Sequence, residues 1–251
     1  MKRVRFTAEG IVHEGIVREG ALYDAEGRRY DPDRVIWLPP VSPTKVLGVA
    51  LNYPEHATEL GMRTPEEPPL FFKPISCLVG HRAPVVYPRG VEYLHYEVEL
   101  AVVIGRRCRK VRPEEAMQVV QGYTIANDIT VRDFVGDFYR PPVRAKGYDT
   151  FGPVGPWVVE GEIEDPHDLE MRVYVNGELR QRGNTREMLW KIPQLITWVS
   201  SFMTLEPGDL ILTGTPRGIS PVRPGDVMRL EIEGIGTLEN PVVAEENGTD
   251  A

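Results

Sequence analysis

Two glutamates on one short segment have the type and spacing to do chemistry together. In LHYEVELAVVIG, Glu97 and Glu99 alternate with apolar residues, which is the two-residue period of a β-strand. Both carboxylates therefore project from one face, about 7 Å apart along the backbone. Beyond Glu99 this face turns apolar, so the strand is expected to enter the core, where like charges need a cation or a shared proton. A hard divalent ion would satisfy both, although two solvated glutamates at a strand end give the same pattern.

A third carboxylate follows another strand-like segment. Asp128 ends the apolar run in GYTIANDITVRD, a common position for a ligand, although turns and helix caps use the same residue type. Three carboxylates would leave a six-coordinate Mg²⁺ ion about three positions for water and substrate. No cluster of His and Cys ligands is present, which argues against zinc. Glu97, Glu99 and Asp128 are the predicted ligands of Mg²⁺, with Mn²⁺ or Ca²⁺ as alternatives.

The segment LNYPEHATELG supplies a candidate base. His56 and Glu59 are three residues apart, so on a helical turn they share a face and can form a hydrogen bond. A carboxylate on one ring nitrogen sets the tautomer and raises the basicity of the imidazole, which could then deprotonate water or a substrate carbon. The prolines and glycine around this pair suggest a loop that could act as a lid. A surface His–Glu pair on a polar helix is the alternative.

The chain that must position these groups is rich in strand patterns. Strands are expected at residues 46–49, 99–104, 154–159, 169–175, 210–213 and 227–232, with a hairpin turn at Asn176-Gly177. Helices are expected at 113–120 and after Asn184, where Glu187 would complete a capping box ahead of an apolar stripe. Many strands with few helices, and no regular βαβ alternation, predict a mostly-β or α+β fold.

The first part of the chain reads as a small β appendage. Short strands are expected at residues 4–6, 11–13, 16–17 and 35–38, broken by Gly, Asp and Pro. Pro39-Pro40, with Pro43 after it, reads as a stiff connector. Residues 1–43 are therefore predicted to form an appendage, and residues 44–251 the main domain.

Composition narrows the class of protein. The 251 residues include 41% apolar residues, carry a net charge of −8 and contain only two cysteines. The charge argues against nucleic acid as a partner, and no apolar stretch approaches the ~20 residues that span a membrane. No secretory signal and no disulfide framework are expected, so a cytoplasmic protein is predicted. The dinucleotide, P-loop, GxSxG and HExxH motifs are absent from the sequence.

Several ordered segments resemble the fumarylacetoacetate hydrolase family over residues 45–243. They are VLGVALNYPEHATELG, PPLFFKP, LHYEVELAVVIG, GYTIANDITVRD, RAKGYDTFGPVGPWV and LEPGDLILTGTPRGI. The protein is expected to lack the long N-terminal domain and the extra catalytic glutamate of true fumarylacetoacetate hydrolases, and its segments are more similar to those of the short members. The resemblance implies mixed β-sheets rolled into a barrel-like body, and a homodimer.

The resemblance also assigns roles to residues. It implies metal ligation by Glu97, Glu99 and Asp128, and it matches His56 and Glu59 to the proton or water handlers on the lid. It places Lys146 in the active site, where an ammonium group would stabilise an enolate or carboxylate oxygen. It also matches Gly214 and Thr215 to a loop that contacts the substrate.

These assignments predict a metal-dependent enzyme that acts on a small 2-oxo or 2-hydroxy-enoate dicarboxylic acid through a metal-chelated enolate. The first choice is 2-hydroxyhepta-2,4-diene-1,7-dioate isomerase of aromatic catabolism, with or without decarboxylase activity. An acylpyruvate hydrolase or an oxaloacetate decarboxylase is the runner-up, because one enolate site supports all three reactions. A non-catalytic metal- or ligand-binding protein on the same fold is a rival of a different class, and the intact set of candidate residues argues against it.

Overall fold

The computed structural model describes residues 1–135 and 141–246, which form three β-sheets with few helices. The largest sheet has twelve strands. Ten of them lie in the order β4 (Arg29–Tyr30), β3 (Ala21–Asp24), β2 (Ile11–Arg18), β1 (Lys2–Ala8), β14 (Gly152–Val159), β12 (Val120–Asn127), β11 (Val98–Ile104), β17 (Leu210–Leu212), β6 (Val46–Val49) and β7 (Leu70–Lys73). The other two, β5 (Ile36–Trp37) and β8 (Leu78–Val79), pair with β1 and β14.

The two smaller sheets lie against this one. A five-stranded sheet has the order β16 (Glu178–Asn184), β15 (Glu170–Val175), β19 (Val227–Ile232), β20 (Gly236–Ala244) and β9 (Val85–Tyr87). A three-stranded sheet has the order β13 (Thr130–Val131), β10 (Leu94–His95) and β18 (Pro221–Val222). The expected hairpin at Asn176-Gly177 is confirmed, since these residues join β15 to β16.

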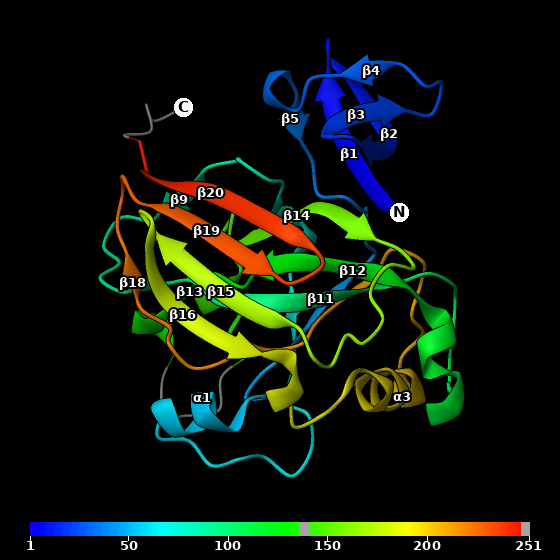
Figure 1. Ribbon diagram of the computed structural model, residues 1–251. Coiled ribbons are helices and arrows are strands. Elements are labelled where there is room, and N and C mark those ends of the chain that lie inside the picture. The colour runs from blue at the N-terminus through cyan, green and yellow to red at the C-terminus, as the bar shows by residue number, and fades with distance from the viewer. Residues whose placement is uncertain (136–140, 247–251) are drawn as a thin grey trace.

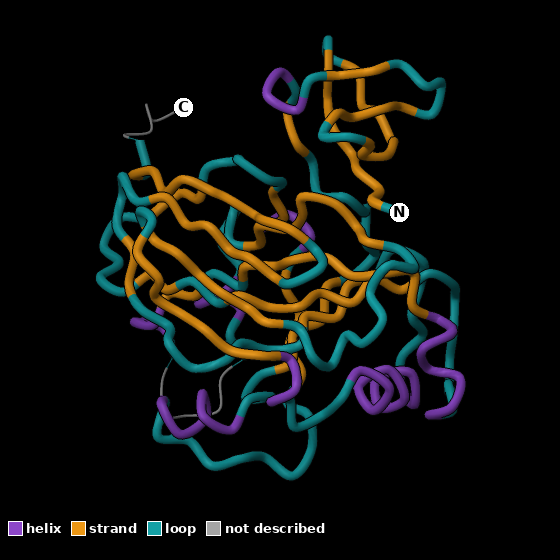
Figure 2. The backbone as a smooth tube through the Cα atoms, in the orientation of Figure 1, coloured by secondary structure: helices purple, strands orange, loops and turns teal. Residues whose placement is uncertain are grey.

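Two of the helices, α1 (Pro54–Glu59) and α3 (Ile192–Phe202), lie at the edge of the molecule, outside the sheets (Figure 1, Figure 2). The α-helices are α1 (Pro54–Glu59), α2 (Val143–Lys146) and α3 (Ile192–Phe202). Short 3₁₀ helices are η1 (Pro32–Arg34), η2 (Ile75–Cys77), η3 (Pro113–Val119), η4 (Arg132–Phe134) and η5 (Thr185–Glu187). The mostly-β prediction is therefore confirmed. The twelve-stranded sheet runs as an open path from β4 to β7, so the described strands do not close into the barrel that the resemblance implies.

The main core lies between the five-stranded sheet and strands β11, β12 and β14, which Figure 1 shows behind it. The alternating apolar face of β11, including Leu100 and Val102, packs in this core. The opposite face of β11 carries Ala101 and Val103 in a second apolar cluster. Because side chains alternate along a strand, Glu99 lies on this second face, one step beyond its apolar part.

The first strands project from the main body (Figure 1). They have a small core of their own that includes Phe6 and Leu22. Their sheet continues into the body, because Lys2 of β1 pairs with Val159 of β14. The division at residue 43 stays a prediction.

Two expected strands in this region are one strand, β2, which passes through Gly15. A side chain at Gly15 would collide with the Tyr23 carbonyl oxygen, so this glycine marks a close backbone approach rather than a break.

The helix predicted to open at Asn184 begins later. The Asn184 side chain accepts a hydrogen bond from the Arg186 N–H, 2.8 Å away, but it caps only the 3₁₀ turn η5. The chain then extends, because Asn52 binds the backbone of Leu189 and Trp190. Helix α3 starts after that contact. The helix expected at residues 113–120 is the 3₁₀ helix η3, which ends where β12 begins.

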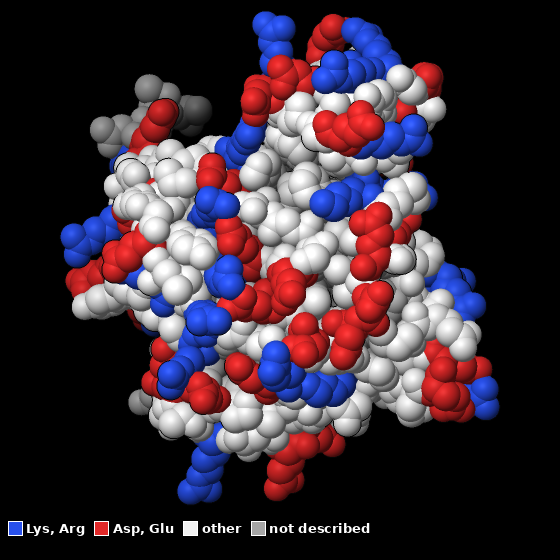
Figure 3. All heavy atoms as spheres, viewed as in Figure 1, with Lys and Arg blue, Asp and Glu red and all other residues white. Residues whose placement is uncertain are grey.

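On the face drawn in Figure 3, acidic and basic side chains are interspersed. Among the described residues, no helix is long and apolar enough to cross a membrane.

Asp209 anchors the start of β17 to the start of the main body. Its fully buried carboxylate accepts hydrogen bonds from the Thr44 hydroxyl at 2.7 Å, from the backbone N–H groups of Thr44 and Lys45 at 3.0 and 3.1 Å, and from the Glu206 N–H at 2.7 Å. It also pairs with the Lys45 ammonium group. Burial raises the pKa of Asp209, but these hydrogen bonds and the Lys45 charge outweigh burial and hold the pKa below its usual value.

Replacing Asp209 with asparagine is therefore expected to lower the free energy of unfolding by about 2–4 kcal/mol near neutral pH, because charge-assisted hydrogen bonds are lost. A depressed folded-state pKa adds stability above the unfolded aspartate value of about 3.9. That stability is lost as the pH falls through the folded-state value. The difference in the free energy of unfolding between the wild type and Asp209→Asn, measured by urea titration, should thus become smaller at acidic pH. A Glu206→Gln control should change stability by less than about 1 kcal/mol, and equal losses in both variants would contradict this role.

Candidate active site

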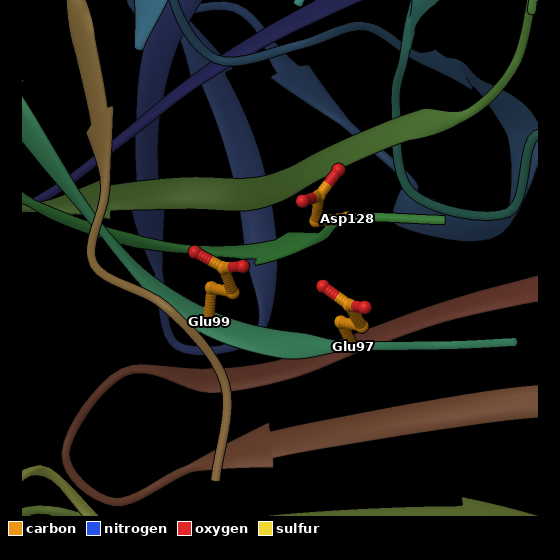
Figure 4. A group of neighbouring side chains, drawn as sticks. All are labelled: Glu97, Glu99 and Asp128. Atoms are coloured by element: carbon orange, nitrogen blue, oxygen red, sulfur yellow. The ribbon is translucent and has the colours of Figure 1, made fainter. Parts of the chain in front are cut away.

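Strand pairing brings three carboxylates together. Strand β11 runs antiparallel to β12, with Glu99 opposite Ala126 and Val98 opposite Asn127. One step further, the Asp128 N–H donates to the Glu97 carbonyl oxygen at 3.0 Å, so these two residues face each other. Figure 4 shows Glu97 and Glu99 on the same side of β11, directed toward the end of β12 where Asp128 lies. All three are buried, and oxygen atoms from each lie within 4.8 Å of one another. The predicted convergence is observed.

Three cations surround this triad. The Lys146 ammonium group donates hydrogen bonds to Glu97 at 3.0 Å and to Asp128 at 2.5 Å. The Lys73 ammonium group donates to the other Asp128 oxygen at 2.6 Å and to the Lys146 carbonyl oxygen at 2.7 Å. The Arg132 guanidinium group pairs with the second oxygen of Glu97. Buried charges are tolerated only when they are paired, and this network pairs Glu97 and Asp128.

The electrostatic surroundings shift the pKa values of the two glutamates in opposite directions. Burial raises the pKa of Glu97, but the charges of Lys146 and Arg132 outweigh burial and hold this pKa far below its usual range. Burial raises the pKa of Glu99 well above its usual value, and the neighbouring charges of Asp128 and Glu97 raise it further. Lys146 stays charged, because the carboxylates overcome the effect of burial and raise its pKa.

The triad fits a hard divalent cation. Its donors are carboxylate oxygens from three residues, the ligand type that Mg²⁺ and Mn²⁺ prefer. The pKa of Glu99 is raised because its ionised form would be buried and would lie beside the charges of Asp128 and Glu97. A divalent ion between the three carboxylates would stabilise the ionised form, so Glu97, Glu99 and Asp128 are the residues that would hold it.

The His56–Glu59 pair lies on α1, as the spacing predicts. His56 Nδ1 is 2.9 Å from Glu59 Oε2, and a carboxylate can only accept, so Nδ1 carries the hydrogen. The other ring nitrogen, Nε2, is then available as a base. The imidazole is buried, whereas the Glu59 side chain is 30% exposed and borders a surface hollow with Gly218. Among the described residues, His56 makes no hydrogen bond to the triad.

A loop after β17 connects the triad to this pair. The Gly214 N–H donates to Glu99 Oε2 at 2.6 Å, and the Gly218 N–H donates to Glu59 Oε1 at 3.0 Å. Gly214 has φ +88°, and a side chain there would press on Asn52 and on the Val49 carbonyl oxygen. Gly214 therefore contacts a candidate ligand directly. Thr215, the next residue, is buried beside it.

Sequence reasoning missed Lys73 and Arg132. Lys73 stands in PPLFFKP, and Arg132 follows Asp128 by four residues, so both lie in segments that the resemblance covers. A lysine in an otherwise apolar strand was the available signal for Lys73. Arg132 follows the short buried strand β13, and its side chain is only 15% exposed. Most arginines are exposed, so its residue type carried no comparable signal.

Comparison with known proteins places the chain in a family. The model of the fumarylacetoacetate (FAA) hydrolase C-terminal family matches residues 45–243. The 4-hydroxyphenylacetate degradation bifunctional isomerase/decarboxylase of Salmonella dublin is 50% identical over 210 residues, covering 83% of this chain and 49% of that protein. The chain thus spans about half the length of this curated relative. It belongs to the fumarylacetoacetate hydrolase family, as the ordered motifs indicate.

Solved structures match over their full length. The 2-hydroxyhepta-2,4-diene-1,7-dioate isomerase of Mycobacterium marinum is 38% identical with a TM-score of 0.88, covering 98% of this chain and 100% of that chain. The maleylpyruvate hydrolase of Sphingobium sp. SYK-6, solved in complex with manganese (II) ion and pyruvate, is 33% identical with a TM-score of 0.83 over the same shares. Enzymes with isomerase and hydrolase names therefore share this fold.

Proposed function

We propose that this protein is a divalent-metal-dependent 2-hydroxyhepta-2,4-diene-1,7-dioate isomerase of aromatic catabolism, with or without decarboxylase activity. The observation that carries the proposal is the buried carboxylate triad with Lys146 in direct contact. The likeness to the Mycobacterium marinum isomerase supports the choice of reaction. The Salmonella dublin isomerase/decarboxylase supports the wider class.

In the proposed isomerisation, different residues have different roles. A Mg²⁺ or Mn²⁺ ion held by Glu97, Glu99 and Asp128 would supply Lewis-acid chemistry, drawing negative charge from substrate oxygens. Isomerisation of the dienol removes a proton from the 2-hydroxyl group and adds one at C5, giving the 2-oxo-3-ene. His56, oriented by Glu59, accepts and returns protons through Nε2. Lys146 presents a buried positive charge to the oxygen that becomes negative.

A panel of substrates tests the proposal. The purified protein, with Mg²⁺ or Mn²⁺, should convert 2-hydroxyhepta-2,4-diene-1,7-dioate fastest, followed by its ultraviolet absorbance. The maleylpyruvate hydrolase neighbour favours an acylpyruvate hydrolase as the second candidate. Turnover of acylpyruvates or oxaloacetate alone would replace the isomerase with that candidate or with a decarboxylase. A protein that binds metal but turns over none of the panel would favour a non-catalytic binding protein.

Replacing His56 tests the proposed base. The variant His56→Gln keeps a polar group beside Glu59 but cannot take up a proton, so we expect kcat to fall by about 10²-fold. Mn²⁺ affinity should stay unchanged, because His56 makes no hydrogen bond to the triad among the described residues. Glu55→Gln is the matched control, since Glu55 lies on the same helix but is exposed beside Arg217. An unchanged kcat in His56→Gln would remove this residue from the mechanism.

We further propose that the enzyme works in the cytoplasm as a homodimer, with a small oxo-acid as its partner and neither nucleic acid nor membrane. The net charge of −8 supports the exclusion of nucleic acid. Phe72 on the edge strand β7 and Val143 on the adjacent helix α2 are exposed apolar side chains, which supports a second copy covering them. Sedimentation of the purified protein tests the dimer.

A further inference from the structure

Gln181 is a buried amide that the proposed mechanism does not use. It is the only fully buried residue of β16, and it is 1% exposed. A buried amide costs free energy unless its N–H and C=O groups are all hydrogen-bonded. Its partners therefore indicate what holds it there.

The amide lies where two neighbouring strands separate. Strand β17 pairs with β11 as far as Leu212, which faces Ala101. Thr213 still donates to the Leu100 carbonyl oxygen. Beyond Thr213 the chain leaves β11, and the Gly214 N–H binds the side chain of Glu99. Gln181 reaches between the two segments, since its Oε1 accepts from the Val98 N–H at 3.4 Å and its Nε2 donates to the Thr215 hydroxyl at 2.9 Å. Gln181 thus connects the strand that carries Glu97 and Glu99 to the loop that carries Thr215.

Two backbone groups determine which way this amide faces. The Pro216 carbonyl oxygen, 2.6 Å from Nε2, can only accept, and the Val98 N–H can only donate. The nitrogen of the amide must therefore face the loop, and the oxygen must face β11. The Thr215 hydroxyl then has to accept the second N–H of Gln181. Its own hydrogen is directed elsewhere, and within residues 1–135 and 141–246 no acceptor takes it.

The loop after β17 that carries Thr215 also contacts the carboxylate triad. Gly214 binds Glu99, so the Thr215 hydroxyl lies one residue from a candidate metal ligand. A donor aimed at the position where negative charge develops stabilises an oxyanion, provided that its direction is preset. When a hydroxyl oxygen accepts a hydrogen bond from a buried amide, the direction of its own O–H is fixed in advance.

We propose that Gln181 is a positioning residue that makes the Thr215 hydroxyl a hydrogen-bond donor to an oxygen of the bound 2-oxo acid. The inference rests on the proposed function, in which the substrate is a 2-oxo or 2-hydroxy-enoate. Gln181 acts through Thr215 and does not touch the substrate.

Pyruvate in saturating Mn²⁺ is the probe, with its Kd measured by calorimetry. In Gln181→Glu, an ionised carboxylate has no hydrogen to donate, and a protonated one has a single hydrogen, which the Pro216 carbonyl oxygen takes. In either state the Thr215 hydroxyl turns and donates to the new carboxyl group. We expect the Kd for pyruvate to rise about tenfold, the effect of one hydrogen bond to a charged group. Thr215→Val should raise the Kd for pyruvate by the same factor, and Thr215→Ser should bind pyruvate as tightly as the wild type does. Gln118→Glu makes the same change at an exposed position and should change nothing.

The double variant separates positioning from a general structural role. If Gln181 acts through Thr215, then Gln181→Glu with Thr215→Val should lose no more than either single variant. The Kd for Mn²⁺ alone should stay at the wild-type value in all variants, which shows that the triad is intact. A Kd for pyruvate that rises about a hundredfold in the double variant would overturn the proposal. Wild-type affinity for pyruvate in Thr215→Val would also overturn it, and this result does not depend on whether Gln181→Glu folds.

Failure of the proposed function has a different signature. In that case the wild type would bind pyruvate with Mn²⁺, and the coupling between Gln181 and Thr215 would be measurable, but no substrate of the panel would react. A wild-type protein that turns over the panel but binds no pyruvate with Mn²⁺ would overturn the inference about Gln181 and leave the proposed function intact.

Discussion

Asp128→Asn is expected to weaken Mn²⁺ binding by more than about 100-fold and to abolish turnover. Changes in groups that only support metal ligands cost 10- to 100-fold, so loss of a ligand oxygen should cost more. The variant also places an amide NH₂ group against Lys73 or Lys146, which now donate to the two oxygens of Asp128. Breaking such a buried pair costs about 3–5 kcal/mol, so thermal unfolding should be measured beside metal titration.

A second variant separates lost binding from lost stability. Glu99→Gln should keep the hydrogen bond from the Gly214 N–H, because the amide oxygen still accepts. It should therefore fold at least as stably as the wild type without metal, while binding Mn²⁺ more weakly. Glu114→Gln, an exposed carboxylate in η3, is the control and should bind normally. If a folded Asp128→Asn or Glu99→Gln protein binds Mn²⁺ as tightly as the wild type, the triad is not the metal site.

The triad could be predicted because its geometry follows from local rules. Glu97 and Glu99 share a face through the period of a strand, and this part needs no tertiary information. Asp128 joins them only through the register in which Val98 faces Asn127. That register depends on pairing between distant segments. The sequence offers Asp128 as a candidate only through its residue type at the end of a strand-like run, and the resemblance to a family supports that candidate.

The position of Lys73 beside Asp128 and the start of helix α3 could not be predicted from local sequence patterns. Lys73 meets Asp128 across 55 residues of sequence, and no periodicity reports such a contact. Asn184 has the residue type of a helix cap and does cap a turn, but the backbone contacts of Asn52 delay helix α3. In both cases, tertiary hydrogen bonds override the local signal. The prediction that residues 1–43 form an appendage follows from short strand patterns and the prolines after them, whereas the pairing of β1 with β14 does not.

The proposed reaction and its rivals share one intermediate. In the proposed mechanism, isomerisation, decarboxylation and hydrolysis each pass through an enolate that the metal ion and Lys146 would stabilise. The products differ in whether a proton, carbon dioxide or water is handled next. In this proposal the His56–Glu59 pair serves each of these steps, so the panel of substrates distinguishes the three reactions.

Lys146→Met should lower kcat by about 10²–10³-fold, the usual effect of removing one group that stabilises an oxyanion. The ammonium group of Lys146 has three hydrogens, and the structure assigns them to Glu97, Asp128 and Thr130. A substrate oxygen must replace one of these acceptors. Glu97 is the one most easily released, because Arg132 also pairs with it and a bound metal would draw it away.

Mn²⁺ affinity distinguishes a catalytic role of Lys146 from a structural one. Removing a positive charge from between two carboxylates should leave Mn²⁺ binding unchanged or make it tighter, since the cation no longer competes with the metal. Lys110→Met, at an exposed position, is the control. If Lys146→Met loses Mn²⁺ binding together with kcat, the lysine builds the metal site. If kcat is retained, the negative charge on the substrate is stabilised by the metal ion and Thr215 without Lys146.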